Sequence, residues 1–162
     1  YVVDVQMRVL GAEDPNMLTF KYNLATCLYQ QRKHGEAEQI LREVLEIRKR
    51  IIGCEHPSTL TTTCKLAYCL AYLSRHAEAE ALQRQVLAAQ ERVLGVGHPD
   101  TLTTKNNLAK FVFTQEKYLQ AEELWTGVLA GKKRVLGDEH PATQATAHNL
   151  VQCVCKRKKA AE

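Results

Sequence analysis

Three histidines that stand at a constant spacing raise the question of a metal site. His56, His98 and His140 each precede a proline, and the same interval separates each histidine from the next. Imidazole is a frequent metal ligand, but zinc needs all its ligands within about 2.0–2.3 Å of one ion. If the spacing reflects stacked repeats, equivalent positions lie about one helix diameter, roughly 10 Å, apart. We therefore expect these histidines to cap helix starts beside the prolines, and we expect no metal site.

The six cysteines are a second group with potential chemistry. Cys27, Cys69 and Cys153 occupy one position of the same periodic spacing, which is typical of small core residues. Cys153 and Cys155 lack the Cys-x-x-Cys spacing of zinc sites, and on a helix their side chains project about 200° apart. Equivalent positions in a stack are too distant for disulfides. We expect free thiols, a reducing compartment and a cytoplasmic protein.

No catalytic motif is recognisable. The chain has no Gly-Lys-Ser/Thr phosphate loop and no Gly-x-Ser-x-Gly nucleophile turn. Paired carboxylates such as Glu122 and Glu123 fall at expected helix starts, where the helix dipole accounts for them. Trp125 shares a repeat position with Leu41 and Gln83, which indicates packing between helices. We predict a protein that is not an enzyme and that binds no cofactor.

A 42-residue spacing governs the whole chain. All four prolines follow it, and so do one glycine and one leucine column. A constant period in this range is the signature of stacked repeats. The columns are Pro15, Pro57, Pro99 and Pro141; Gly11, Gly53, Gly95 and Gly137; and Leu24, Leu66, Leu108 and Leu150.

Each repeat predicts two helices and no strand. The glycine suits a left-handed residue that ends one helix, and the proline that follows it in the same loop suits the first turn of the next. Helix A is predicted at about 58–73 and 100–115, with apolar residues at three- and four-residue steps. Helix B follows a short polar turn and begins with acidic residues such as Glu36 and Glu78.

The repeat boundaries predict one domain cut from a longer array. They give a partial helix B at 1–10, repeats at about 11–52, 53–94 and 95–136, and a partial repeat at 137–162. Open ends of this kind need capping repeats, so self-association through them is an expectation. Gly127 and Gly131 lie inside the third helix B, which is therefore expected to be soft or bent.

The bulk composition excludes some partners. The net charge of +4 is matched by the four basic residues 156–159 alone, which we interpret as a frayed, solvated tail. Nucleic-acid binding through that tail is the minority alternative. No apolar run approaches the length that a membrane-spanning helix needs, so no membrane span is predicted. We do not expect the segment 1–8 to be a signal peptide, because it lacks a basic leader and a continuous apolar stretch.

Short motifs recur from repeat to repeat and resemble the 42-residue tetratricopeptide repeat of kinesin light chains. The motifs are Asn-Leu-Ala at 23–25 and 107–109, Glu-Ala-Glu at 36–38 and 78–80, and Arg-Val-Leu-Gly at 92–95 and 134–137. The chain departs from that family at the turn between helices A and B. Arg32, Ser74 and Glu116 stand where the family usually has glycine, and His34 and His76 replace the aromatic residue that Tyr118 retains.

The resemblance implies an all-α fold, a right-handed α-α superhelix of antiparallel helix pairs whose A helices line a concave groove. In kinesin light chains that groove takes extended, acidic, often tryptophan-containing peptides, and asparagines hold the peptide backbone. The lining positions that it implies in this chain are Tyr22, Asn23, Thr26, Gln30, Cys64, Lys65, Tyr68, Tyr72, Asn106, Asn107, Lys110, Thr114, His148, Asn149, Gln152 and Lys156.

Two functional hypotheses follow from the repeat and the resemblance. In the first, the chain is a protein-interaction scaffold whose groove binds a peptide or a partner domain. Its lysines favour an acidic ligand, and its tyrosines favour apolar or aromatic groups. In the second, it is a structural or regulatory arm of a larger signalling protein of the nucleotide-switch type, with no peptide ligand of its own.

Overall fold

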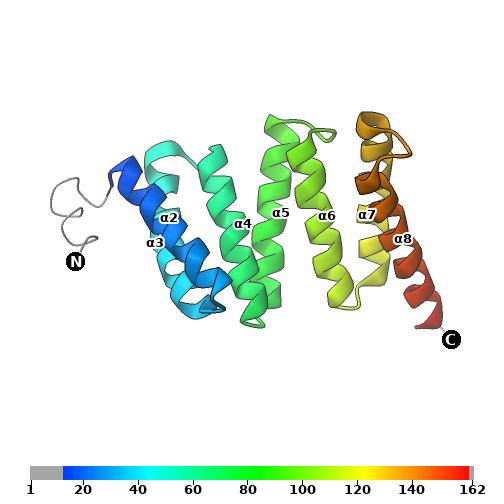
Figure 1. Ribbon diagram of the computed structural model, residues 1–162, viewed down its shortest axis with the longest axis horizontal. Helices are drawn as coiled ribbons and strands as arrows, with labels where there is room; N and C mark the ends of the chain where they lie inside the picture. Colours follow the sequence, from blue (N-terminus) through cyan, green and yellow to red (C-terminus); the bar gives the residue numbers. More distant parts are fainter. Residues whose placement is uncertain (1–12, 161–162) are drawn as a thin grey trace. The chain divides into compact units, whose positions relative to one another are not determined.

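Helices account for every regular element in residues 13–160, the part of the chain that this computed structural model describes. No strand occurs within those residues, which confirms the prediction of an all-α fold. The predicted partial helix at 1–10 lies outside them. The helices in Figure 1 are α2 (Pro15–Gln30), α3 (His34–Ile52), α4 (Pro57–Tyr72), α5 (His76–Val93), α6 (Pro99–Thr114), α7 (Tyr118–Leu136) and α8 (Pro141–Lys159).

The A helices α2, α4, α6 and α8 begin at a proline, one residue earlier than predicted for α4 and α6. Proline suits this position because its fixed φ matches the helix and its missing N–H needs no partner. The histidines before α4, α6 and α8 act as caps, as predicted. The Nδ1 atoms of His56, His98 and His140 accept hydrogen bonds of 3.1–3.2 Å from the backbone two residues later.

The B helices α3 and α7 end at a glycine with positive φ. Gly53 and Gly137 have φ of 88° and 87° with ψ of 163° and 166°, and Gly95 also has φ of 88°. Positive φ at Gly95 was predicted and is confirmed. The ψ values correct the expected left-handed helical cap at Gly53 and Gly137, because they lie in an extended region that is essentially open only to glycine. Gly11 lies outside the described residues.

The turns between helices A and B have left-handed backbone at residues other than glycine. Arg32, Ser74 and Glu116 have φ of 64°, 62° and 61°. Each turn is closed by a backbone hydrogen bond that joins its far end to the last turn of helix A, such as the 2.9 Å bond from Arg75 N to Leu70 O. These residues stand where the related repeats usually have glycine, so the backbone of the turn is kept although its favoured residue is absent.

The chain divides into two compact units, residues 1–82 and 83–162, with the boundary inside α5. In unit 1 the helix α3 packs against both α2 and α4 (Figure 1). The buried apolar residues of unit 1 follow helical spacing along the faces where these three helices meet. They include Met17, Ala25, Ala37, Leu41, Val44, Leu66, Ala67 and Leu70.

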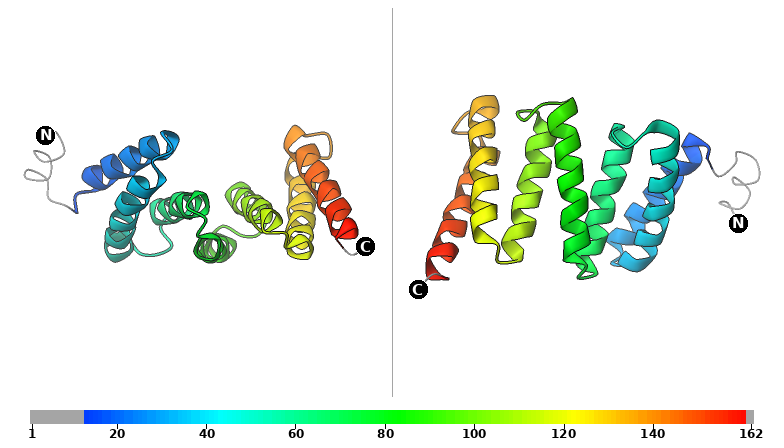
Figure 2. Two further views of the ribbon diagram at one scale, coloured as in Figure 1. Left: turned by 90° about the horizontal axis from the view of Figure 1, so that it is seen from below. Right: turned by 180° about the vertical axis from the view of Figure 1, so that it is seen from behind.

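In unit 2 the helix α7 packs against both α6 and α8 (Figure 2). A core cluster forms around Trp125 and contains Leu87, Leu108, Ala109, Val112, Ala121 and Cys153. The prediction that Trp125 packs between helices is confirmed. Gly131 brings α6 and α7 close together, because a Cβ at this position would lie 2.5 Å from Cδ2 of Leu102. This close approach is a packing reason for the glycine in α7.

Two expectations about side-chain burial and order are wrong. Cys27 is exposed, whereas Cys69 and Cys153 at the same repeat position are buried. The described residues include no helix before α2 that could cover Cys27. The basic residues 156–159 are not frayed, because they form the last turn of α8. Arg157 holds that turn against α7 through a 2.6 Å ion pair with Glu122.

The cysteine chemistry follows from these positions. All six thiols are free. Cys153 is buried and Cys155 is exposed, which confirms that their side chains project to different faces of α8. Burial raises the pKa of Cys153, and it raises the pKa of Cys69 to about 11, so both thiols stay protonated and unreactive at neutral pH. Among residues 13–160, no group of three or more His, Cys, Asp or Glu side chains is placed to hold a metal ion.

Candidate functional site

The helix-A face of unit 1 carries a cluster of three aromatic side chains that come from three helices. We call Tyr29 of α2, His34 of α3 and Tyr72 of α4 the aromatic platform. The His34 and Tyr72 rings stack with centroids 4.6 Å apart and planes 11° apart. Tyr29 meets Tyr72 edge-on at 5.6 Å and His34 at 5.1 Å. These are favourable aromatic geometries, so each ring restricts the rotamers of the others.

Tyr72 stays accessible although two rings hold it in place. It is 65% exposed, the most exposed of the large apolar side chains among the described residues. A cavity of about 180 Å³ adjoins the platform, and Gln30 and Arg32 complete its lining. An exposed ring in a fixed orientation beside a small hollow is suited to receive one apolar or aromatic side chain.

Positive charge borders the platform. The Lys65 ammonium lies 5.2 Å from the centre of the Tyr29 ring, within cation–π range. Burial, followed by the hydrogen bond and the charge of Tyr72, raises the pKa of Tyr29 far above its ordinary value of 10.0. Tyr29 is therefore neutral at physiological pH. The Lys65 ammonium next to Tyr29 favours ligands that carry a carboxylate beside the side chain that contacts Tyr72.

The first repeat contributes fewer accessible groups than its sequence implied. Tyr22 is half-buried, and its ring lies 5.4 Å from the guanidinium of Arg48. Thr26 is also half-buried, and its hydroxyl donates a 3.0 Å bond to the Tyr22 carbonyl. Asn23 and Gln30 are exposed. Of these four residues, the structure brings only Gln30 to the cavity beside the platform.

The helix-A face of unit 2 keeps only part of the platform among the residues described. Phe113 and Tyr118, at the repeat positions of Tyr29 and His34, meet edge-on at 5.5 Å. Lys156 stands at the repeat position of Tyr72. The Asn106 Oδ1 accepts a 3.1 Å bond from the Trp125 indole, so part of its hydrogen-bonding capacity is used within the chain. Thr114 donates to the Phe111 carbonyl. Asn107 is half-buried and Lys110 is exposed on α6. On α8, His148 and Gln152 bond to each other at 2.9 Å, Asn149 is half-buried and Lys156 is exposed.

Sequence reasoning missed two members of the platform, Tyr29 and His34. Neither falls on a lining position of the related repeats, and the equivalent of Tyr72 in the first repeat is Gln30. Their shared signal was that all three aromatic side chains stand next to a turn between helices A and B. Tyr68 and Lys65 were predicted on this face. Lys65 contacts Tyr29, and the half-buried Tyr68 contributes to the raised pKa of Tyr29.

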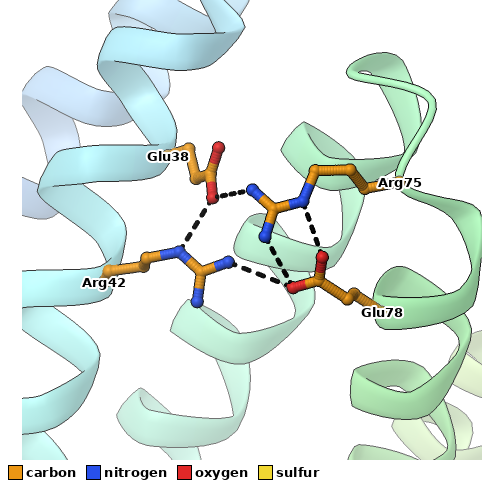
Figure 3. Close-up of polar contacts among 4 residues, drawn as sticks. All are labelled: Glu38, Arg42, Arg75 and Glu78. Carbon is orange, nitrogen blue, oxygen red and sulfur yellow. Dashed lines mark hydrogen bonds and ion pairs between the residues drawn. The ribbon is translucent and has the colours of Figure 1, made fainter.

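A closed ring of charges connects two B helices in unit 1 (Figure 3). It joins α3 to the turn before α5 and to the first turn of α5. Arg75 donates to Glu38 at 2.6 Å and to both oxygens of Glu78 at 2.6 and 2.7 Å. Arg42 donates to Glu38 at 2.8 Å and to Glu78 at 3.4 Å. The Arg75 hydrogen bonds lower the pKa of Glu78. The alternating charges neutralise one another across the two B helices, so the ring is a surface ion-pair network and not a reactive group.

The arrangement of consecutive helix pairs defines the class of protein. The sequence profile of the tetratricopeptide repeat family matches residues 16–92 and 60–124, which together span more than half of the chain. The chain belongs to the tetratricopeptide repeat family. Proteins of this family generally act as protein-interaction scaffolds and are typically not enzymes.

Solved structures narrow the similarity to arrays of the kinesin light chain type. A Podosopora anserina protein described as a putative kinesin light chain with nearly identical TPR-like repeats is 29% identical, with a TM-score of 0.87. The match covers 98% of this chain and 75% of that chain, and a single-residue variant of the same protein matches equally well. BtubC (BKLC) from P. vanneervenii has a TM-score of 0.81 over 90% of this chain and 58% of that one. At 20% identity it supports the fold alone. No curated protein matches the chain.

Within residues 13–160, no helix is both long enough and apolar enough to cross a bilayer.

Proposed function

We propose that the chain is a scaffold that binds a linear segment of a partner protein on the helix-A face of unit 1. The partner places an aromatic or apolar side chain against Tyr72 and a carboxylate near Lys65. The single observation that carries the proposal is the aromatic platform, since a 65% exposed tyrosine is stacked on His34 and buttressed by Tyr29. A ring that is already ordered loses little side-chain entropy when a ligand binds it.

The rest of the proposed role follows from the same assignment. The chain binds and does not catalyse, uses no cofactor and works in the cytoplasm, where its six free thiols persist. Polar groups of unit 2, such as the half-buried Asn107 and the exposed Lys110, supply backbone and carboxylate contacts to segments that bind there. The competing hypothesis, a structural arm without a peptide ligand, predicts no affinity for peptides.

A peptide selection tests this proposal. Short linear peptides are selected on the whole chain from a random library, and the enriched sequences are measured by fluorescence polarisation. We expect enrichment of an aromatic residue flanked by acidic residues. Tyr72→Ala should weaken binding at least tenfold, about 1.4 kcal/mol. Lys65→Met keeps the aliphatic stem and should weaken binding less.

Leu119→Ala is the matched control, because Leu119 is 60% exposed on a B helix. It removes an apolar side chain of comparable exposure that is not part of the platform, and it should leave the affinity unchanged. Failure to enrich any peptide, or equal affinities of the wild type and Tyr72→Ala, would reject the platform and leave the structural arm as the better hypothesis.

A further inference from the structure

A second cavity lies in unit 1, where the starts of α2 and α4 meet the end of α3. It has a volume of about 180 Å³, and we call it the helix-start cavity. Its wall is mainly apolar and includes Pro15, Leu18, Ile51 and Ile52. Sites for drug-sized ligands have volumes of roughly 300–1,000 Å³. The helix-start cavity is smaller, so its size suits a single residue of a partner.

The apolar wall of this cavity is partly open to solvent. Ile51 and Ile52 are the last two residues of α3, and they are 46% and 40% exposed. Single exposed apolar residues are ordinary on a protein surface, but these two line a cavity together with the buried Leu18. A branched aliphatic side chain that entered would remove apolar surface of both partners from water, which is favourable in proportion to the area covered.

Arg48 supplies a buried positive charge at the same cavity. The residue is 7% exposed, and its Nη1 donates to the Ser58 carbonyl at 3.0 Å and to the Thr62 hydroxyl at 2.7 Å. Both acceptors are neutral. A guanidinium has five N–H donors, and within residues 13–160 no partner accepts from Nε or Nη2 of Arg48. Neither of these nitrogens is fully enclosed, so both can donate to a ligand.

No carboxylate among residues 13–160 balances the charge of Arg48. Glu13 lines the cavity, but it forms an ion pair with the exposed Arg50. Burial lowers the pKa of Arg48, and the influence that opposes burial comes from Tyr22 and not from a carboxylate. The charges of Glu13 and Arg50 cancel, so the cavity keeps one positive charge. Because a buried charge without an ionic partner is costly, an anion that reached Arg48 would stabilise it.

We propose that the helix-start cavity binds the C-terminal residue of a partner protein, and that this residue has an aliphatic side chain. The terminal carboxylate accepts hydrogen bonds from Nε and Nη2 of Arg48, because a planar guanidinium matches a carboxylate in two parallel bonds. The aliphatic side chain contacts Ile51 and Ile52. A C-terminal leucine, isoleucine or valine carries both groups on one carbon, whereas an aspartate or glutamate side chain offers little to the apolar wall.

This site shares no residue with the aromatic platform and does not depend on the proposed function. NMR titration of the whole chain with N-acetylisoleucine, which mimics a chain end, tests it. We expect shifts of the Arg48 Nε–H and of the Ile51 and Ile52 methyl groups. N-acetylisoleucinamide lacks the charge and should bind about tenfold more weakly. N-acetylalanine lacks the branched side chain and should bind about threefold more weakly. Equal affinities of the acid and either comparison compound would overturn the proposal.

Variants of the chain locate the binding. Arg48→Gln introduces the residue found at position 90 of the next repeat and should abolish the preference for the acid over the amide. Arg48 also bridges α3 to α4, so a second variant leaves that bridge intact. Glu13→Gln removes the carboxylate that lines the cavity and should strengthen binding of the acid about twofold.

Glu139→Gln is the matched control, because Glu139 stands at the repeat position of Glu13 in unit 2. It should leave the affinity for N-acetylisoleucine unchanged, and so should Tyr72→Ala on the aromatic platform. Shifts confined to residues 156–159 or to the surroundings of Lys65 would overturn the proposal. Equal affinities of the wild type and Glu13→Gln would overturn it as well.

Discussion

Unit 1 and unit 2 build the same bridge from a B helix to the following A helix, but they use different cations. In unit 1, Arg48 donates to the Ser58 carbonyl at 3.0 Å and to the Thr62 hydroxyl at 2.7 Å. In unit 2, Lys132 donates to the Ala142 carbonyl at 3.2 Å and to the Thr146 hydroxyl at 2.9 Å. Each donor and each acceptor occupies the same repeat position as its counterpart in the other unit.

The repeat fixes the hydrogen-bonding positions and leaves the exposed positions free to vary. Both bridging cations are partly or fully buried, and burial lowers the pKa of each. At the A-helix surface the units diverge, because unit 1 presents the aromatic platform and unit 2 presents amides and Lys110. The backbone is shared by all the repeats, whereas a binding surface needs only a few side chains to change.

The largest expected difference between the units comes from the repeated leucine. Leu108 is fully buried in unit 2, whereas Leu24 at the same position in unit 1 is 38% exposed. Leu108→Ala should lower the free energy of unfolding by about 2–5 kcal/mol, because it leaves a cavity. Leu24→Ala should cost less than about 1 kcal/mol. Urea denaturation measures both, and similar costs for the two variants would contradict the difference in burial.

Two glycines of α7 should respond in opposite ways to the same substitution, although they lie on one helix. Gly131→Ala forces a Cβ to within 2.5 Å of Leu102 and should destabilise the chain by about 1–3 kcal/mol. Gly127→Ala meets only the flexible end of Lys105 and should stabilise the helix by about 0.5–1 kcal/mol. Thermal unfolding compares the two variants. A stabilised Gly131→Ala chain would mean that the close approach of α6 and α7 has been misassigned.

Substitution to glycine in the turn between helices A and B should raise the stability of both units alike. Ser74→Gly in unit 1 and Glu116→Gly in unit 2 relieve left-handed backbone at a residue with a Cβ, so each should stabilise by about 1 kcal/mol. Gly95→Ala is the converse and should destabilise by about 1 kcal/mol or more, because its φ is 88°. Denaturant midpoints report all three. A loss of stability in either turn variant would argue against its backbone conformation.

The smallest expected effect concerns the bridging cation that can titrate. Burial, and next the charge of Lys110, lowers the pKa of Lys132 below its ordinary value of 10.5. The unfolded chain therefore binds more protons between the lowered pKa and 10.5, so stability rises with pH across that window. Lys110→Gln should move the pKa of Lys132 upward and flatten the rise. NMR titration of the Lys132 side chain measures the shift, and an unchanged pKa would show that the two ammonium groups do not interact.

Much of the fold could be read from the sequence. The periodic columns predicted the helix pairs, the histidine caps, the packing of Trp125 and the positive φ at Gly95, because each depends on local backbone geometry repeated many times. The burial of Cys27 was predicted wrongly, since burial depends on which neighbouring helix covers a position. The order of residues 156–159 was also missed, because it rests on the contact between Arg157 and Glu122, which are far apart in sequence.

The candidate sites divide in the same way. By itself the sequence determined the repeat and its helices, because periodic hydrophobicity specifies which side of a helix is buried. The resemblance to kinesin light chains implied the lining positions Lys65, Tyr68 and Tyr72. Only the tertiary structure decided that Tyr29, His34 and Tyr72 meet, that Asn106 is engaged by Trp125, and that Leu18 and Arg48 line one cavity. The physical reason is that these contacts join different helices, and their geometry depends on side-chain packing between helices, which no periodicity along the chain encodes.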